Sequence, residues 1–522
     1  MRSVERARVA TWLPWSALLV ALPWLWPFTY GPTAATLPYL ASATAGALLL
    51  ALWPQRAPQG GAAVMAGGWL LAAALSAVVA LLQYFNLEGP FFPWFNQARP
   101  GQAFGNLRQP NQLASLLVIG LLALGWCAQR QRTVRQAAPW LAALLLAALA
   151  ATASRVGAVA LLALAAMAGW WAWRAGQGRR ALGWLGAGLA LYAVAALALP
   201  WALQAGGGGA GRDLLERLQN AEGTCGSRLI LWRNVLHLIG LRPWTGWGWG
   251  ELDYAHYITL YDGPRFCHIL DHAHNLPLHL AVELGVPVAV AACAALAWLV
   301  WRGRPWAERD SARQMAWGVL AVIGIHSLVE YPLWYGPFQI AALLCIGLLW
   351  CTRPRTQPAQ ADEEAPGGRR ASGWRMARWA VALLVLAAVA YTGWDYRRVS
   401  QIYLPPEKRA APYRMDAMAH ARQSRLFAGV VRFAEVTTYP ATRENASWLL
   451  PAALKTLHFS PEPRVAIKVI ESATLLGQDA LALQHLRRFK AAFPKAHALW
   501  REENQRMQGG APRAEVPLLD AR

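Results

Sequence analysis

Long apolar runs dominate this chain and limit what it can fold into. Hydrophobic residues make up 56% of the 522 residues and charged residues only 15%, which excludes an ordinary soluble globular protein. Eleven apolar windows are long enough to cross a bilayer, at 11–28, 33–53, 62–84, 110–128, 138–153, 156–173, 181–203, 275–301, 314–331, 336–351 and 379–394. The sequence therefore predicts an all-α, polytopic membrane bundle of eleven transmembrane helices.

Arginines are concentrated in alternate connections between these windows, and the net charge is +21. One set of connections holds 19 arginines, at 1–10, 54–61, 128–137, 174–180, 302–313 and 352–375. The opposite short connections hold three, at 29–32, 85–109, 154–155 and 332–335. Because arginine-rich loops stay in the cytoplasm, we expect a cytoplasmic N-terminus and, after an odd number of spans, an external C-terminus. The charge thus points to membrane lipids and not to nucleic acid.

Four parts follow from this topology. They are N-terminal transmembrane helices at 1–203, a large external loop at 204–274, a second transmembrane group at 275–394 and an external helical domain at 395–522. Lysine first appears at Lys408, and prolines punctuate the last part into paired helices. We see no catalytic motif in it, so packing or protein docking is its expected role.

Two of the six cysteines, Cys225 and Cys267, share the external loop, while the others lie in or at the ends of spans. Disulfides persist outside the cytoplasm. We predict a Cys225–Cys267 bridge, with two unpaired thiols as the alternative.

The polar stretch 271–279 ends this loop and carries three histidines. Asn275 is placed to cap the next helix, and His279 faces Glu283 one turn later, as a structural pair would. His274 has no such structural role, which makes it the catalytic candidate, and His272 lies on the approach. A zinc site is the less favoured alternative, because such groupings arise by chance in histidine-rich segments; its ligands would be His268, Asp271, His272 and His274. We expect no metal and no cofactor.

Other polar groups stand at the predicted outer ends of spans. The start of the 110–128 window carries four polar side chains, Arg108, Gln109, Asn111 and Gln112. Capping explains only one of them, so the others suggest a hydrogen-bonding site for sugar or phosphate. Arg155 lies in an external turn, where arginine is disfavoured. His326 and Glu330 are one turn apart and form either a structural pair or part of a site, in both cases facing the protein interior.

The segment 226–241 is too short to cross a bilayer. Its Ser227 is a natural N-cap, and Arg233, Asn234 and His237 cluster on one side, which predicts an amphipathic helix lying in the interface. Three tryptophans set among glycines follow it and are expected at headgroup depth, namely Trp244, Trp247 and Trp249.

Taken in order, these motifs resemble the bacterial PglL-type protein O-oligosaccharyltransferases of the O-antigen ligase and polymerase (Wzy) superfamily. The motifs are Arg108-Gln-Pro-Asn-Gln112, Ser154-Arg155, Gly226-Ser-Arg228, His272-Ala-His-Asn275 and His326-Ser-Leu-Val-Glu-Tyr-Pro-Leu-Trp334. No single motif is specific, but their joint order is, and the resemblance is strongest from about residue 100 to residue 350.

The resemblance implies transfer of a preassembled glycan from undecaprenyl diphosphate to a Ser or Thr hydroxyl of a pilin-like exported protein. The reaction would take place on the periplasmic face of the bacterial inner membrane. His274 would be the general base, and Arg155 and Arg228 would hold the diphosphate; Arg212, Arg217 and Arg233 stay open as alternatives to Arg228. Residues implied in substrate binding are Arg108, Gln109, Asn111, Gln112, His272, Asn275, His326, Glu330 and Tyr331. Direct displacement would be inverting and, without an external DxD motif, metal-independent.

Three rival functions remain open. Within the superfamily the chain could ligate O-antigen to lipid A core or polymerise repeat units, and the C-terminal domain favours the protein acceptor only moderately. From another class, a transporter would place polar residues at broken helices near the midplane of repeated halves. This sequence concentrates them at one face.

Overall fold

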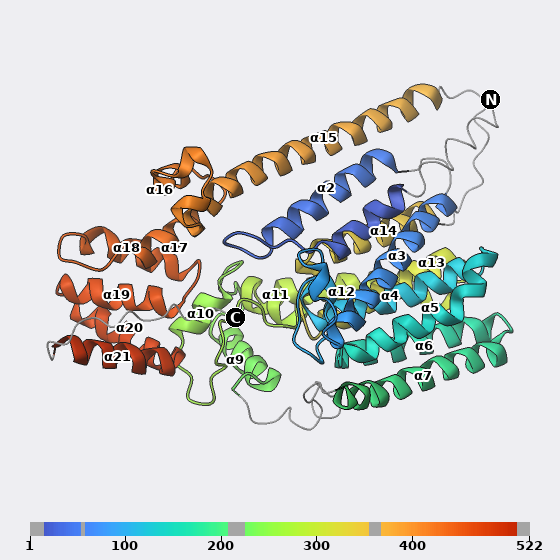
Figure 1. Cartoon of the computed structure of the whole chain (residues 1–522), viewed down its shortest axis with the longest axis horizontal. Coiled ribbons are helices and arrows are strands. Elements are labelled where there is room, and N and C mark those ends of the chain that lie inside the picture. The colour runs from blue at the N-terminus through green and yellow to red at the C-terminus, as the bar shows by residue number, and fades with distance from the viewer. Residues whose placement is uncertain (1–14, 54–57, 207–224, 354–366, 509–522) are drawn as a thin grey trace. The chain divides into compact units, whose positions relative to one another are not determined.

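The computed structural model describes residues 15–53, 58–206, 225–353 and 367–508, and within these ranges every regular element is a helix (Figure 1). Seven of the described helices are long and apolar enough to cross a membrane, and three more are apolar but shorter. The all-α, polytopic fold class is thus confirmed. The described chain forms two compact units. The first comprises 1–221, 274–276 and 294–397, and the second 222–273, 277–293 and 398–522, apart from the ranges left out above.

The ten described apolar helices are Trp15–Leu25, α2 (Thr36–Leu52), α3 (Pro58–Tyr84), α4 (Pro110–Ala128), α5 (Arg132–Ala151), α6 (Arg155–Arg174), α7 (Gly178–Ala205), α12 (Val286–Gly303), α14 (Gly336–Cys351) and α15 (Gly367–Ser400), and α13 (Ser311–Ser327) lies between α12 and α14 in the chain. The other helices are α9 (Arg228–Leu241), α10 (Leu252–Ile258), α11 (Leu276–Leu284), α16 (Ala417–Ala421), α17 (Ala428–Thr438), α18 (Ala446–Leu457), α19 (Pro463–Leu475), α20 (Asp479–Ala492) and α21 (Pro494–Gln508). Single 3-10 turns lie at Gly89–Phe91, Gly105–Leu107, Pro305–Ala307, Pro332–Trp334, Gln401–Tyr403, Pro406–Lys408 and Ala411–Tyr413.

Helix α4 is the centre of the first unit and packs against α3, α5, α6 and α13. Small residues allow these close approaches, as is usual between membrane helices. A Cβ on Gly120 would lie 2.3 Å from that of Ala73 on α3, and one on Gly157 of α6 would lie 2.6 Å from that of Ala114 on α4. By contrast, only 6% of the apolar window of α7, α12 or α15 is buried, which suits helices that face lipid.

The prediction that residues 275–301 form a single spanning helix was wrong. The structure divides it into α11 and α12, with a break at Gly285, whose φ is +90°. A left-handed backbone cannot continue a right-handed helix. As a result, α11 is a short helix of nine residues, and the membrane-length helix begins only at Val286.

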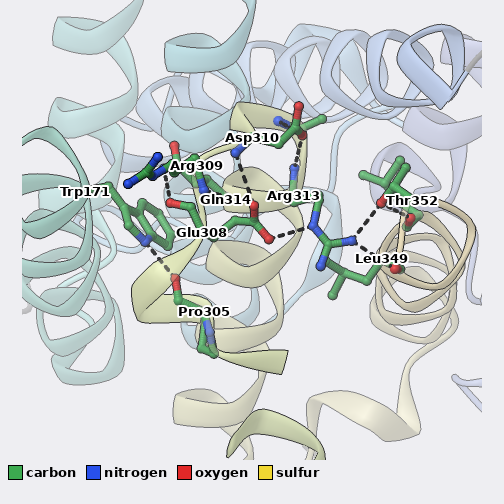
Figure 2. A network of polar contacts seen from close by, with 11 residues as sticks. Trp171, Pro305, Glu308, Arg309, Asp310, Arg313, Gln314, Leu349 and Thr352 are labelled. Atoms are coloured by element: carbon green, nitrogen blue, oxygen red, sulfur yellow. Dashed lines mark hydrogen bonds and ion pairs between the residues drawn. The ribbon is translucent and has the colours of Figure 1, made fainter. Parts of the chain in front are cut away.

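A polar network joins the C-terminal ends of α6 and α14, the connection after α12 and the start of α13 (Figure 2). Arg313 donates from Nε to the Glu308 carboxylate at 2.6 Å, and from Nη1 to the carbonyl of Leu349 at 3.0 Å and to the Thr352 hydroxyl at 2.8 Å. The indole of Trp171 on α6 donates to the carbonyl of Pro305 at 2.8 Å. The connection between α12 and α13 is thereby attached to two neighbouring helices.

The second unit combines the loop helices with the C-terminal helices. Tyr257 of α10 lies in one apolar core with α17 to α20, and its hydroxyl is 3.2 Å from Nδ1 of His485. Cys225 and Cys267 form a disulfide in this unit. Ser227 caps α9 as predicted. The exposed, interfacial position expected for Asn234 was wrong, because its buried amide bonds the backbone of Pro264 and Phe266.

Arg313→Ala tests the network of Figure 2. The substitution leaves the Glu308 carboxylate, whose side chain is only 14% exposed, without its cation, and breaking a pair of this kind costs about 3 kcal/mol. We expect a clearly lower thermal unfolding midpoint in detergent. Arg309→Ala, at an exposed neighbouring position, is the matched control; equal midpoints for the two variants would contradict the assignment.

Asp253→Asn tests a buried carboxyl group of α10. Burial raises the pKa of Asp253 to about 7, and the carboxylates of Asp271, Glu251 and Glu283 add to the rise. A carboxyl with a raised folded-state pKa stabilises the fold below its unfolded pKa and loses that contribution as the pH rises to the folded value. The unfolding midpoint of the variant should therefore gain on wild type from about pH 4 to about pH 7 and level off above. A difference that does not change with pH would show that Asp253 ionises normally.

Candidate functional site

A small cavity lies where α4 and α14 begin and α13 ends. Its lining residues are Gln109, Gln112, His326, Glu330, Tyr331, Pro332 and Tyr335. Five of these seven residues had been singled out in the sequence as substrate-binding candidates. They come from two segments far apart in the chain, so tertiary packing is what brings them together.

The start of α4 contributes the first wall of the cavity. Gln109 is the N-cap, and its side-chain oxygen accepts from the backbone N–H of Gln112 at 2.7 Å, the capping role that the sequence allowed. Pro110 occupies the first helical position, where its missing N–H costs nothing. Arg108 has a left-handed backbone with φ +61°, and its exposed guanidinium donates to the hydroxyl of Thr29.

The start of α6 is tied directly to α4. Ser154 is the N-cap of α6 and accepts from the N–H of Gly157 at 3.0 Å. Its hydroxyl also donates to the amide oxygen of Asn111 at 2.7 Å. Arg155 is the first residue of α6 and is exposed; within the described ranges its guanidinium has no hydrogen-bond partner. A cation thus stands at a helix N-terminus, where the backbone itself favours an anion.

His274 and Glu330 make a short polar contact in the site. Nδ1 of His274 lies 2.6 Å from Oε2 of Glu330, and both side chains are largely buried, at 16% and 11% exposed. The other carboxylate oxygen is 3.5 Å from the Asn111 amide nitrogen. The ring of Tyr331 stands edge-on to the imidazole at 4.8 Å. Asn275, the neighbour of His274, donates to the carbonyl of Leu328 at 2.9 Å.

The chemical consequence lies in the second ring nitrogen. A carboxylate that accepts from Nδ1–H holds the neutral imidazole in one tautomer and leaves Nε2 able to take a proton. The same carboxylate then stabilises the imidazolium that forms. The backbone of His274 is left-handed, with φ +49°, a conformation that persists only when the surrounding contacts hold it.

His326 has a different partner from the one its spacing suggested. Its Nδ1 lies 2.9 Å from the Ser115 hydroxyl, and the residue is 1% exposed. Glu330, one turn later, pairs instead with His274. Both side chains do face the protein interior, as expected, and both line the same cavity.

Two other candidates, Arg228 and His272, belong to the second unit. Arg228 is the first residue of α9, directly after the Ser227 cap. His272 lies 3.4 Å from the Asp271 carboxylate and stacks on His279 at 5.3 Å between ring centroids. Arg212 and Arg217 lie outside the described residues. The expected pair His279 and Glu283 is present, with 3.5 Å between Nε2 and Oε2.

A metal site is not formed by the described side chains. Within that part of the chain, no three His, Cys, Asp or Glu side chains are grouped so that they could hold an ion. This includes His268, Asp271, His272 and His274, the alternative zinc ligands.

The hydrogen bonds of Ser115 and Ser154 were not predicted from the sequence, although Ser154 belongs to the Ser154-Arg155 motif. Ser115 follows Asn111 at a spacing of four residues, so both occupy one face of α4, and this spacing was a usable signal. The bond between Ser154 and Asn111 had no comparable local signal, because it joins two helices.

Comparisons with known proteins match the parts of the chain that carry these motifs. The profile of the family described as "Protein glycosylation ligase" matches residues 103–127. The profile described as "O-Antigen ligase" matches residues 140–293, and the one described as "Virulence factor membrane-bound polymerase, C-terminal" matches residues 314–508. The three matches follow one another along the chain and contain all the motifs at the site.

A curated relative points the same way. A general O-oligosaccharyltransferase of Acinetobacter baylyi is 26% identical over 293 residues, which are 54% of this chain and 49% of the relative. The chain therefore matches about half the length of this relative. The order of motifs, the three family matches and the helical fold agree: the chain is similar to the O-antigen ligases, the membrane-bound polymerases and the PglL-type protein O-oligosaccharyltransferases.

Proposed function

We propose that this chain transfers a preassembled glycan from undecaprenyl diphosphate to a Ser or Thr hydroxyl of an exported, pilin-like protein. The observation that carries the proposal is the contact of 2.6 Å between His274 and Glu330, beside a cavity that Glu330 lines together with the uncharged polar side chains of Gln109, Gln112 and Tyr331. The match to the protein glycosylation ligase profile and the O-oligosaccharyltransferase relative favour a protein acceptor. The enzyme would act at the periplasmic face of the bacterial inner membrane.

In the proposed reaction, His274 is the general base. The acceptor oxygen forms a bond to the anomeric carbon while the bond from that carbon to the phosphate oxygen breaks, which inverts the configuration. The hydroxyl proton passes to Nε2 of His274, and the electron pair of the broken bond leaves with undecaprenyl diphosphate. Glu330 accepts from Nδ1–H throughout and offsets the positive charge on the ring.

Negative charge on the leaving diphosphate needs cations. Arg155 offers an exposed guanidinium at the N-terminus of α6, where helix dipole and side chain act in the same direction. Arg228 has the corresponding place at the start of α9. As the resemblance implies for both residues, guanidinium groups would supply the electrostatic stabilisation that a divalent cation gives in other glycosyltransferases.

Uncharged polar groups of the cavity are suited to orient the sugar. Gln109, Gln112 and Tyr331 line it, while Asn111 is engaged with Ser154 and Glu330. Arg108, His326, Asn275 and His272 keep the substrate-binding roles that the resemblance implies for them. The amide groups of Gln109 and Gln112 and the phenol of Tyr331 can bind sugar hydroxyls without adding charge at the reacting carbon.

The O-antigen ligase profile supports a second candidate with the same chemistry, in which lipid A core is the acceptor. The two acceptors are separable. Purified chain in liposomes with lipid-linked glycan receives either a pilin-like protein or rough lipopolysaccharide, and the glycan adduct is weighed by mass spectrometry. A polypeptide adduct supports the proposal, and an adduct on lipopolysaccharide alone supports the ligase.

His274→Ala and Glu330→Gln in this assay test the roles of the two residues. Loss of a general base lowers kcat by about 10²–10⁴-fold, and we expect this for His274→Ala. Glu330→Gln keeps the shape but removes the charge, so its loss should be smaller. A His274→Ala variant that inserts normally and retains the wild-type rate would contradict the mechanism.

Arg155→Ala tests the diphosphate contact. We expect a marked fall in kcat/KM for the lipid donor, because the interaction strengthens as charge grows on the leaving group. Arg99→Ala is the matched control, since Arg99 is also exposed and lies in the connection before α4. Equal effects of the two substitutions would remove Arg155 from the site.

A further inference from the structure

The loop after α9 runs beside the end of α11 with backbone pairing. The N–H of Trp247 donates to the carbonyl of Val282 at 2.9 Å, and the N–H of Gly248 to that of Glu283 at 3.0 Å. At the other side of the break, the N–H of Val286 donates to the carbonyl of Pro243 at 2.8 Å. These three bonds fix the register of α11 against residues 243–248, a segment that we call the glycine loop.

Two glycines make this approach sterically possible. A Cβ at Gly246 would lie 2.3 Å from the Glu283 carbonyl oxygen, and one at Gly285 would lie 2.3 Å from the Trp244 carbonyl oxygen. Both residues also have positive φ, +68° and +90°, which favours glycine. The end of α11 is therefore held against the glycine loop in one arrangement.

Glu283 lies at the centre of this contact and is 1% exposed. Its carboxylate is 3.5 Å from Nε2 of His279. Burial raises the pKa of Glu283 to about 7, while the N–H groups of Gly250 and Leu252 and the side chain of His272 act in the opposite direction. A buried carboxylate is costly compared with an apolar side chain of similar size. Its presence in the apolar helix α11 calls for a role beyond packing.

Residues connected to Glu283 lie on both sides of His274 in the chain. Two residues before His274, the ring of His272 stacks on His279 with 19° between the planes. Two residues after it, α11 begins at Leu276. The left-handed backbone of His274 thus stands between two segments that both connect to Glu283, one through His279 and the other through α11 itself.

We infer that Glu283 is a positioning residue that holds the backbone of His274 in the conformation its role as base requires. The inference rests on the proposed function. Glu283 itself touches neither donor nor acceptor in this scheme. It acts through His279 and the glycine loop, so its loss should impair the chemical step and leave substrate binding intact.

Glu283→Gln in the full chain, reconstituted in liposomes, tests the inference. We expect kcat for glycan transfer to fall at least about tenfold, with KM for donor and acceptor within about twofold of wild type. Backbone hydrogen exchange, read by mass spectrometry, should rise over residues 270–278 and stay unchanged in α20.

Glu471→Gln, which removes a carboxylate paired with Lys468 on α19, is the matched control. If Glu283→Gln fails to insert, His279→Gln keeps the carboxylate, removes its imidazole partner and gives the same readouts.

Two results would overturn the inference. One is a variant with a lower unfolding midpoint but wild-type kcat and wild-type exchange over 270–278, which describes a merely structural residue. The other is a raised KM at unchanged kcat, which describes a substrate contact. Failure of the proposed function looks different: wild type would then transfer no glycan, while the exchange measurement would still decide whether Glu283 holds this segment.

Discussion

The bond between His274 and Glu330 is the interaction on which the rest of the site depends. A largely buried carboxylate at the end of a helical bundle is stable only with partners. Here the partners of Glu330 form a series of contacting side chains. Ser154 bonds Asn111, Asn111 approaches Glu330, and Glu330 bonds His274. The starts of α6 and α4, the turn after α13 and the histidine are thereby connected. The caps of α4 and α6 place the first two members of this series.

The opposite ends of the same helices show what distinguishes the site chemically. There, too, a carboxylate is largely buried, but Glu308 is paired with Arg313. A guanidinium cannot give up its proton, so that network only holds helices together. An imidazole can accept and release a proton near neutral pH. The choice of histidine as partner of Glu330 is therefore what makes one end of the bundle suited to acid–base chemistry.

Much of the fold could be predicted because membrane-length apolar runs leave few alternatives to helices. The Ser227 cap and a cap near the start of α4 could also be predicted, since capping depends on neighbouring residues. The break at Gly285 was not, because apolar composition continues across it and only the glycine loop explains it. The headgroup depth expected for Trp244, Trp247 and Trp249 stays a prediction, while Gly246 between them serves a backbone contact that the sequence did not indicate.

The residues of the site could largely be predicted from the sequence, but their hydrogen-bond partners could not. His274, Glu330 and the polar residues at the start of α4 could be singled out because polar groups at helix ends are costly near a membrane. Their partners could not. Spacing along one helix suggested that Glu330 pairs with His326, but His274 comes from 56 positions earlier in the chain and makes the bond. Local periodicity carries no information on contacts between segments so far apart.

A structure of the chain in lipid nanodiscs with a non-hydrolysable undecaprenyl diphosphate glycan is the most direct test of this account. The account predicts the diphosphate at the N-terminus of α6, in contact with Arg155, and the anomeric carbon beside the cavity with Nε2 of His274 facing the acceptor side. A donor bound at the opposite helix ends, near Arg309 and Arg313, or one that leaves His274 remote from the anomeric carbon, would contradict it.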